Sequence, residues 1–298
     1  MSPVVVSAEV RAALDTATPV VALETTLVAH GFPAPAGLEV ARKCERSVRG
    51  AGAVPATVGV VDGAIKVGLS EEELERFASS PGARKAGPRD LAACAAQGAL
   101  GATTVGGTLA AARVVGIRFV ATGGLGGVHR GFAQTLDVSP DLGELARTPA
   151  LVVAAGAKSI LDVPATAEAL EALGVPVLGW RTDELPLFYR SGGGPPVSAR
   201  IDGVHEAAEV ARLHWELGRG GIVVARPPDE SLDVEELIEA GVREAEHQGV
   251  RGQDVTPFVL ARLHEASGGR TIEANKRLVA ANAALAAEIA IASGRADA

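Results

Sequence analysis

The stretch Leu151–Asp162, Leu-Val-Val-Ala-Ala-Gly-Ala-Lys-Ser-Ile-Leu-Asp, decides the fold class. Its first five residues are apolar without interruption, which is typical of a strand buried on both faces of a sheet. Lys158 follows just after Gly156, where that strand should end. In α/β proteins this end of a central strand faces the ligand-binding crevice. Partial burial there would favour the neutral amine, which can attack a carbonyl, although a strand-end lysine can equally extend into water.

Strands and helices alternate on both sides of this stretch. We predict strands over 19–23, 54–62, 64–67, 102–105, 118–122, 175–179 and 221–225. We predict helices over 7–16, 37–50, 71–79, 90–98, 108–115, 142–147, 165–173, 203–217, 234–248, 257–267 and 271–294. Asp62-Gly63 predicts a hairpin, and Ser70 with Glu73 a capping box. We therefore expect a layered α/β/α fold with a mixed, mostly parallel central sheet, in one domain over residues 1–298.

Composition narrows the function classes. The formal net charge of −8 argues against a surface for nucleic acid or anionic membrane. The sequence shows no secretory leader and no apolar run that we expect to span a membrane, which favours a soluble, cytoplasmic protein. Cys44 and Cys94 lie in predicted amphipathic helices without metal-ligand spacing, so we expect both in the core.

Two polar sites in the first third of the chain are candidates for chemistry. Glu24 ends a predicted strand ahead of the glycine and proline loop 29–35, which suits a general acid or base, although a structural salt bridge is the alternative. His30 in that loop fits a structural histidine better. The predicted irregular loop 80–89 carries three cations, among them Lys85, which could clamp a phosphate or more simply face solvent.

The middle and the end of the chain add further candidates. Five glycines within 123–131 would let backbone amides approach an anion or a sugar, but their spacing does not match the dinucleotide fingerprint, so we expect no nicotinamide cofactor. Asp137 and Asp141 could hold a hard cation or only cap the next helix. Asn275 and Asn282 share one face of the last helix and could face a pocket or be buried. We expect 190–196 to be a surface loop that could act as a lid.

Several segments occur together in the order typical of one enzyme family. They are VALETT (21–26), AHG (29–31), GAVPAT (52–57), ATGGLGGVHRG (121–131) and AGAKSILD (155–162), and the similarity continues through 256–262 to the last helix. With these motifs, which cover nearly the whole chain, the sequence resembles the pseudouridine-5'-phosphate glycosidase family.

The resemblance implies an enzyme of pseudouridine catabolism, by convention a lyase, that reversibly cleaves pseudouridine 5'-phosphate to uracil and ribose 5-phosphate. It implies a divalent cation, usually Mn²⁺, and a homotrimer. Lys158 would form a Schiff base with C1′ of the opened ribose, Glu24 would donate a proton, and Asp137 would hold the metal, largely through water. The implied substrate-binding residues are Lys85, Val105, Thr122, His129, Ser139, Pro140, Asp141 and Asn282.

Some positions depart from the family pattern. Thr25 replaces the usual serine, residues 86–89 are less polar than expected beside Lys85, and Ala281-Asn282 replaces a pair of asparagines. The last change leaves open whether Asn282 or Asn275 contacts the base.

The residues themselves are consistent with this chemistry. A C-glycosidic bond has no heteroatom leaving group, so cleavage needs an amine, an acid that protonates carbon and a phosphate anchor. Two alternatives remain: another Schiff-base lyase or aldolase acting on a phosphosugar, and a nucleotide-sensing module without turnover.

Overall fold

The computed structural model describes residues 3–80, 82–250, 252 and 255–296. The strands are β1 (Val4–Val6), β2 (Val20–Leu23), β3 (Val54–Val61), β4 (Ala64–Val67), β5 (Arg84–Ala86), β6 (Gly101–Thr103), β7 (Phe119–Ala121), β8 (Leu151–Ala154), β9 (Val177–Trp180), β10 (Ala199–Ile201) and β11 (Ile222–Ala225). The helices of the first half are α1 (Ala8–Asp15), the π-helix η1 (Leu27–Gly31), α2 (Ala36–Ala51), α3 (Glu71–Ser79), α4 (Leu91–Ala96), α5 (Val105–Val114), α6 (Phe132–Thr135) and α7 (Pro140–Arg147). The second half adds α8 (Val163–Ala172), α9 (Val204–Glu216), α10 (Glu235–His247), α11 (Val255–Ala266) and α12 (Arg270–Ala296).

The strands form one sheet in the order β1-β4-β3-β2-β7-β8-β11-β9-β10, and β6 and β5 branch from β3. All pairs are parallel except β3 with β4 and β3 with β6. The predicted hairpin is confirmed: Asp62 and Gly63 both have positive φ, 51° and 79°, as a tight primed turn requires. The mixed, mostly parallel sheet is therefore confirmed.

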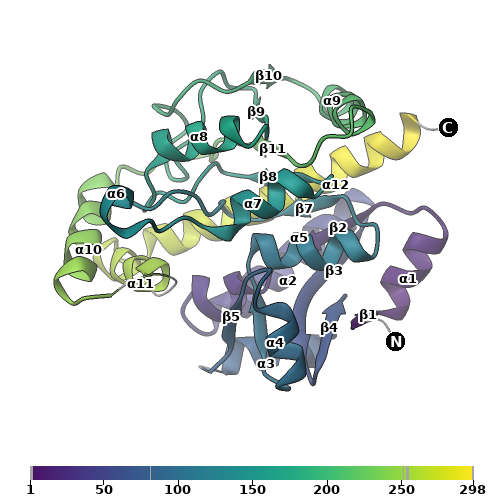
Figure 1. The fold of residues 1–298 in the computed structure, drawn as a ribbon, viewed down its shortest axis with the longest axis horizontal. Helices are drawn as coiled ribbons and strands as arrows, with labels where there is room; N and C mark the ends of the chain where they lie inside the picture. The colour runs from purple at the N-terminus through teal and green to yellow at the C-terminus, as the bar shows by residue number, and fades with distance from the viewer. Residues whose placement is uncertain (1–2, 81, 251, 253–254, 297–298) are drawn as a thin grey trace.

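Helices cover both faces of the sheet. Figure 1 shows α5 and α7 in front of the central strands, with α12 running behind them. The helix α12 packs on α2 and α9 and crosses β2, β7 and β8. Alanine, valine and leucine fill this core, and Cys44 and Cys94 are buried free thiols, as expected. The small side chains let the helices lie close to the strands.

The sequence prediction of spanning segments needs one correction. Within the described residues, Arg270–Gly294 of α12 is long and apolar enough to cross a membrane by length and composition. In this fold 61% of its most apolar window is buried against other elements. A core helix of an α/β protein has this character as well.

Some local predictions were wrong. Residues 27–31, part of which we expected as loop, form the π-helix η1, and residues 84–86 of the expected irregular loop form β5 beside β6. Val105 begins helix α5 rather than ending a strand, because Thr104 caps the helix through a hydrogen bond from Gly107 N to its hydroxyl. The edge strands β1 and β10 were missed, since three residues are too short to show a period of two.

Candidate active site

Three neighbouring parallel strands place the candidate residues at one edge of the sheet. Glu24 follows β2, Thr122 follows β7, and Lys158 lies in the loop after β8. Because the carboxyl ends of adjacent parallel strands meet at the same edge, residues far apart in the sequence come together there.

Glu24 is almost completely buried, with 4% of its surface exposed. The hydroxyls of Thr26 and Thr122 donate hydrogen bonds to its two carboxylate oxygens. Burial raises the pKa of Glu24 above its usual value, against the opposing effects of the Lys158 charge and these two hydrogen bonds. The carboxyl group is thus biased toward the protonated form that a proton donor needs.

The loop that carries Lys158 is fixed by its backbone. Gly156 has φ of 84°, and a Cβ there would collide with the carbonyl oxygen of Pro186, so only glycine fits. Lys158 N donates to Leu125 O at 3.0 Å, and Leu125 N donates to Gly156 O at 3.0 Å. The glycine-rich loop and the lysine loop are therefore joined side by side.

Two adjoining cavities meet at this edge. The inner one, of about 40 Å³, is lined by Glu24, Thr26, Leu27, His30, Gly31, Lys85, Gly123, Gly124, Lys158, Ser159, Phe188, Thr256, Pro257, Leu260 and Asn275. The outer one, of about 550 Å³, is lined by Lys85, Gly87, Arg89, Asp90, Thr104, Gly126, His129, Asp137, Val138, Ser139, Pro140, Asp141, Lys158, Leu161, Gly252 and Thr256. Lys85 and Lys158 border both, so the two amines stand at the junction of a small inner chamber and a ligand-sized outer one.

The outer cavity has a cationic wall. Lys85 lies on β5, and burial together with the nearby charge of Lys158 lowers its pKa. Burial also lowers the pKa of His129, against the charge of Asp137, whose carboxylate oxygen lies 3.8 Å from His129 Nδ1. The lining of this cavity combines four basic side chains with three carboxylates, and its nitrogen groups suit a phosphorylated ligand: Lys85, Arg89, His129 and Lys158, with Asp90, Asp137 and Asp141.

Asp141 organises the loops around the outer cavity. Its carboxylate accepts hydrogen bonds from Gly106 N at 2.7 Å, Gly126 N at 3.1 Å and Thr104 Oγ1 at 3.1 Å. Ser139 caps the helix that carries it, α7, by accepting from Asp141 N, and Pro140 is the first residue of that helix. The carboxylate thus ties the start of α5 and the glycine-rich loop to α7.

We expect Asp141→Ala to lower the free energy of unfolding by about 2–4 kcal/mol, because two buried amides and a hydroxyl lose their acceptor. Urea denaturation of the variant and the wild type measures the difference. Asp137→Ala, whose carboxylate is more exposed, is the matched control and should change stability little. Equal stabilities of the wild type and Asp141→Ala would contradict this organising role.

Three of the implied substrate-binding residues, Val105, Thr122 and Asn282, do not line these cavities, and Thr122 is fully buried beside Glu24. Asn282 is fully buried, and its amide donates to Thr122 O at 2.8 Å, behind the strand end. Asn275, two turns earlier on α12, borders the inner cavity, whereas the buried Oδ1 atoms of both asparagines have no hydrogen-bond partner among the described residues. Val105 is buried at the first position of α5. Asn275 is therefore the asparagine placed to contact a ligand.

Several cavity residues escaped sequence reasoning. Phe188 lies against Gly124 in the inner cavity, in a left-handed conformation with φ of 61°. Thr256 and Leu260 reach the cavity from the start of α11, and His30 reaches it from η1. The family motifs over 29–31 and 256–262 gave a signal, although we expected His30 to be a structural histidine and it lines the cavity. Nothing local in the sequence shows that these segments fold over the strand ends. The segment 190–196 borders other pockets instead.

Within the part of the chain that the structure describes, no group of three or more His, Cys, Asp or Glu side chains is arranged to hold a metal ion. Asp137 is a partly exposed carboxylate on the outer cavity. A single carboxylate with water and ligand oxygens is a common arrangement for Mg²⁺-like cations, so Asp137 fits a cation held largely through water.

Comparisons with known proteins agree with this architecture. The family model described as indigoidine synthase A like protein matches residues 9–292. A pseudouridine-5'-phosphate glycosidase of Sorangium cellulosum is 50% identical over 96% of this chain and 92% of its own length, and one of Glaesserella parasuis is 45% identical over 96% and 97%.

Two solved structures share the fold. The prealnumycin C-glycosynthase AlnA, in complex with ribulose 5-phosphate, superposes with a TM-score of 0.89 at 42% identity, covering 99% of this chain and 98% of its own. An indigoidine synthase A like protein from Thermotoga maritima gives a TM-score of 0.88 at 38% identity, with coverage of 98% and 97%. The chain therefore belongs to the pseudouridine-5'-phosphate glycosidase family, within the indigoidine synthase A like proteins.

Proposed function

We propose that the chain reversibly cleaves the C-glycosidic bond of pseudouridine 5'-phosphate to give uracil and ribose 5-phosphate. One observation carries the proposal: Glu24, with its raised pKa, and Lys158 line one inner cavity that adjoins an outer cavity with several basic side chains. The names of relatives at 45–50% identity support the same substrate.

In this proposal the two cavities would hold different parts of the substrate. The phosphate would lie in the outer cavity near Lys85 and His129, and the base in the inner one between Phe188 and Asn275. C1′ would then lie near Lys158, which borders both. The inner cavity is small, so a bound ring requires apolar side chains such as Leu260 to move aside.

The chemistry can be written so that it balances. The C1′–O4′ bond breaks as Lys158 Nζ bonds to C1′, and O4′ takes a proton. Glu24 protonates C5 of the uracil ring. The C1′–C5 bond then breaks, its electron pair restores the ring double bond, and the nitrogen lone pair forms the C1′ iminium. Water hydrolyses the iminium, which releases ribose 5-phosphate and the free amine.

Uracil release tests this proposal against its alternatives. Purified protein incubated with pseudouridine 5'-phosphate should produce uracil and ribose 5-phosphate in equal amounts. An aldolase would instead split the carbon chain of a sugar phosphate, and a sensing module would bind the nucleotide without releasing either product. Failure to form uracil while the nucleotide stays intact would sink the proposal.

A second candidate has its own support. The relative at 42% identity is named as the prealnumycin C-glycosynthase and its structure contains ribulose 5-phosphate, so a protein of the same fold is named for the synthesis of a C-glycoside. Incubation with ribose 5-phosphate and a panel of carbon-nucleophilic rings decides between the two. Preference for a larger aromatic ring over uracil would favour the synthase.

We expect Asn275→Ala to raise KM for uracil in the synthetic direction by about 10-fold, because the buried Asn275 Oδ1 can accept from a ring N–H. Initial rates at varied uracil and saturating ribose 5-phosphate measure this change. The matched control, Asn282→Ala, should instead lower stability, because the Thr122 carbonyl loses its donor. A raised KM only in Asn282→Ala would reverse the assignment.

We also propose that Asp137 holds a divalent cation, which would be recruited with the phosphate and would supply positive charge to it. Chelation should then reduce turnover, and Mn²⁺ should restore it. Asp137→Asn should raise the Mn²⁺ concentration needed for half-maximal binding by about 10- to 100-fold, read by electron paramagnetic resonance of Mn²⁺ with ribose 5-phosphate. Unchanged Mn²⁺ binding in the variant would remove Asp137 from the site.

The implied homotrimer and cytoplasmic location stay predictions.

A further inference from the structure

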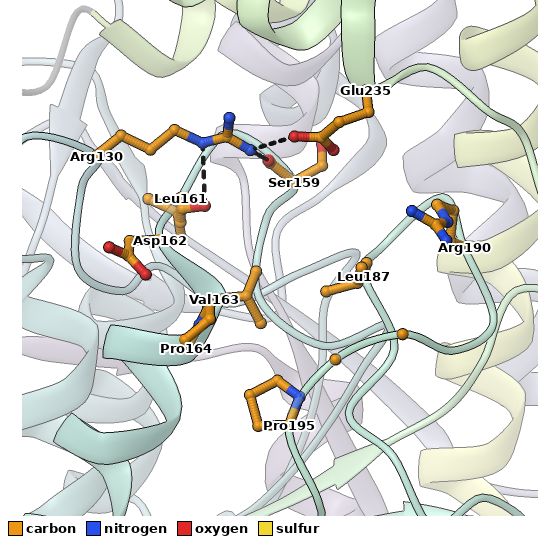
Figure 2. A pocket seen from close by; sticks show the side chains of 12 residues that line it. Arg130, Ser159, Leu161, Asp162, Val163, Pro164, Leu187, Arg190, Pro195 and Glu235 are labelled. Carbon is orange, nitrogen blue, oxygen red and sulfur yellow. Dashed lines mark hydrogen bonds and ion pairs between the residues drawn. The ribbon is translucent and has the colours of Figure 1, made fainter.

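Arg130 makes contacts that the proposed chemistry does not use. It follows His129 in the glycine-rich loop, and its side chain lines a third pocket, of about 590 Å³ (Figure 2), rather than the inner or the outer cavity. There its Nη2 donates to Ser159 O at 3.1 Å, and its Nε donates to Leu161 O at 3.4 Å. The guanidinium therefore bridges two carbonyls directly after Lys158.

A carboxylate holds the guanidinium in this orientation. Glu235, the first residue of α10, lies with Oε1 at 2.8 Å from Arg130 Nη2, and both side chains are partly exposed. An exposed ion pair contributes little to stability, so the contact is better suited to orienting the planar fork than to holding the fold. Figure 2 shows the three contacts converging on one guanidinium.

The lysine loop is held at its two ends by backbone bonds to the glycine-rich loop, and Leu161 N also donates to Lys158 O within it at 3.0 Å. It contains no regular helix or strand between β8 and α8, and its backbone is joined to the glycine-rich loop by Lys158 N to Leu125 O and by Asp162 N to Val128 O. Ser159 and Leu161 lie between these two bonds. The Arg130 guanidinium supports the middle of the loop through the carbonyls of Ser159 and Leu161, two residues that also line the inner and the outer cavity, respectively.

We propose that Arg130 is a positioning residue, which holds the Lys158 loop so that the amine faces the inner cavity. Its kinetic consequence rests on the proposed function. Because a shift of about 1 Å in a reacting group can cost about 10²-fold in rate, loss of the fork should act on the chemical step. Arg130 contacts neither cavity, so substrate affinity should be spared.

Hydrogen exchange without substrate tests the support of the loop. The amides of 157–162 should exchange faster in Arg130→Ala than in the wild type, with β8 unchanged. Arg130→Lys, which keeps the charge but not the fork, should lie between the two, and it replaces the alanine variant if that variant does not fold. Equal exchange over 157–162 in all proteins would overturn the proposal, whether or not the proposed reaction occurs.

Kinetics then test the consequence. We expect kcat of Arg130→Ala to fall by about 10- to 100-fold with KM nearly unchanged. Arg190→Ala, which removes the other arginine of the same pocket, is the matched control and should leave kcat unchanged. A rise in KM with constant kcat, or an equal loss in Arg190→Ala, would overturn the positioning role. A wild type that releases no uracil would instead refute the proposed function, and the exchange result would still decide the role of Arg130.

Discussion

Lys158→Ala should lose uracil release by about 10⁴-fold or more, the scale seen when a covalent catalyst loses its nucleophile. In the proposed reaction the lone pair of this nitrogen forms the C1′ iminium as the electron pair of the C1′–C5 bond returns to the uracil ring, so the step depends on this amine. The Lys158 amine borders both cavities, so its loss also removes a positively charged group from the place where they meet. Product formation from pseudouridine 5'-phosphate, followed by chromatography, measures the loss.

Lys158→Arg separates nucleophilicity from charge. The guanidinium keeps the positive charge at the same place but has no free lone pair for attack. We therefore expect it to be as inactive as the alanine variant while it still binds ribose 5-phosphate. Substantial activity in Lys158→Arg would mean that the residue acts through its charge, and the Schiff base would be wrong.

Glu24→Gln should lower kcat by about 10²- to 10⁴-fold, because the amide keeps the shape of the side chain but cannot donate a proton to carbon. The hydroxyls of Thr26 and Thr122 bond different oxygens of Glu24, so in glutamine one can still donate to the amide oxygen while the other accepts from the amide nitrogen. The matched control is Glu45→Gln, a partly buried carboxylate on α2 that bonds Thr57 away from both cavities. A loss confined to KM in Glu24→Gln would contradict the role of a proton donor.

The pH dependence follows from the direction of the Glu24 shift. Its pKa is raised, so the donor stays protonated above the usual value of 4.5 and activity should fall as pH rises through the raised pKa. The same sign applies to stability: the protonated group stabilises the fold fully below about 4.5, and this contribution is lost as pH rises through the folded value. Glu24→Gln should therefore gain stability relative to the wild type with rising pH, which urea denaturation at two pH values measures.

The sequence predicted those parts of the fold that have a strong local signal. The apolar run before Lys158 became β8 in the centre of the sheet, and Asp62-Gly63 and the Ser70 capping box appear as predicted. The short strands β1, β5 and β10 and the π-helix η1 were not predictable, because their conformations depend on neighbours distant in the sequence. Lys85 is placed at the site because it lies on β5. This strand exists only through its pairing with β6, which no local pattern in the sequence shows.

The candidate site shows the same limit. Glu24 and Lys158 could be selected because each follows a strong strand signal. The position of Asn275, rather than Asn282, on the cavity wall depends on the rotation of α12 against β7, which two residues on one helix face do not reveal. The orientation of the Phe188 ring toward the inner cavity likewise depends on its contact with Gly124, which is distant in the sequence.

The central claim is that Lys158 Nζ bonds to C1′ of the sugar, and peptide mapping after borohydride reduction tests it most directly. Lys85 borders the same cavities and has a lowered pKa, so it is the competing amine. After reduction with ribose 5-phosphate, the account predicts the mass of the reduced sugar phosphate on the peptide that contains Lys158, and its absence in Lys158→Ala. A label on Lys85, or no label in a protein that releases uracil, would contradict it.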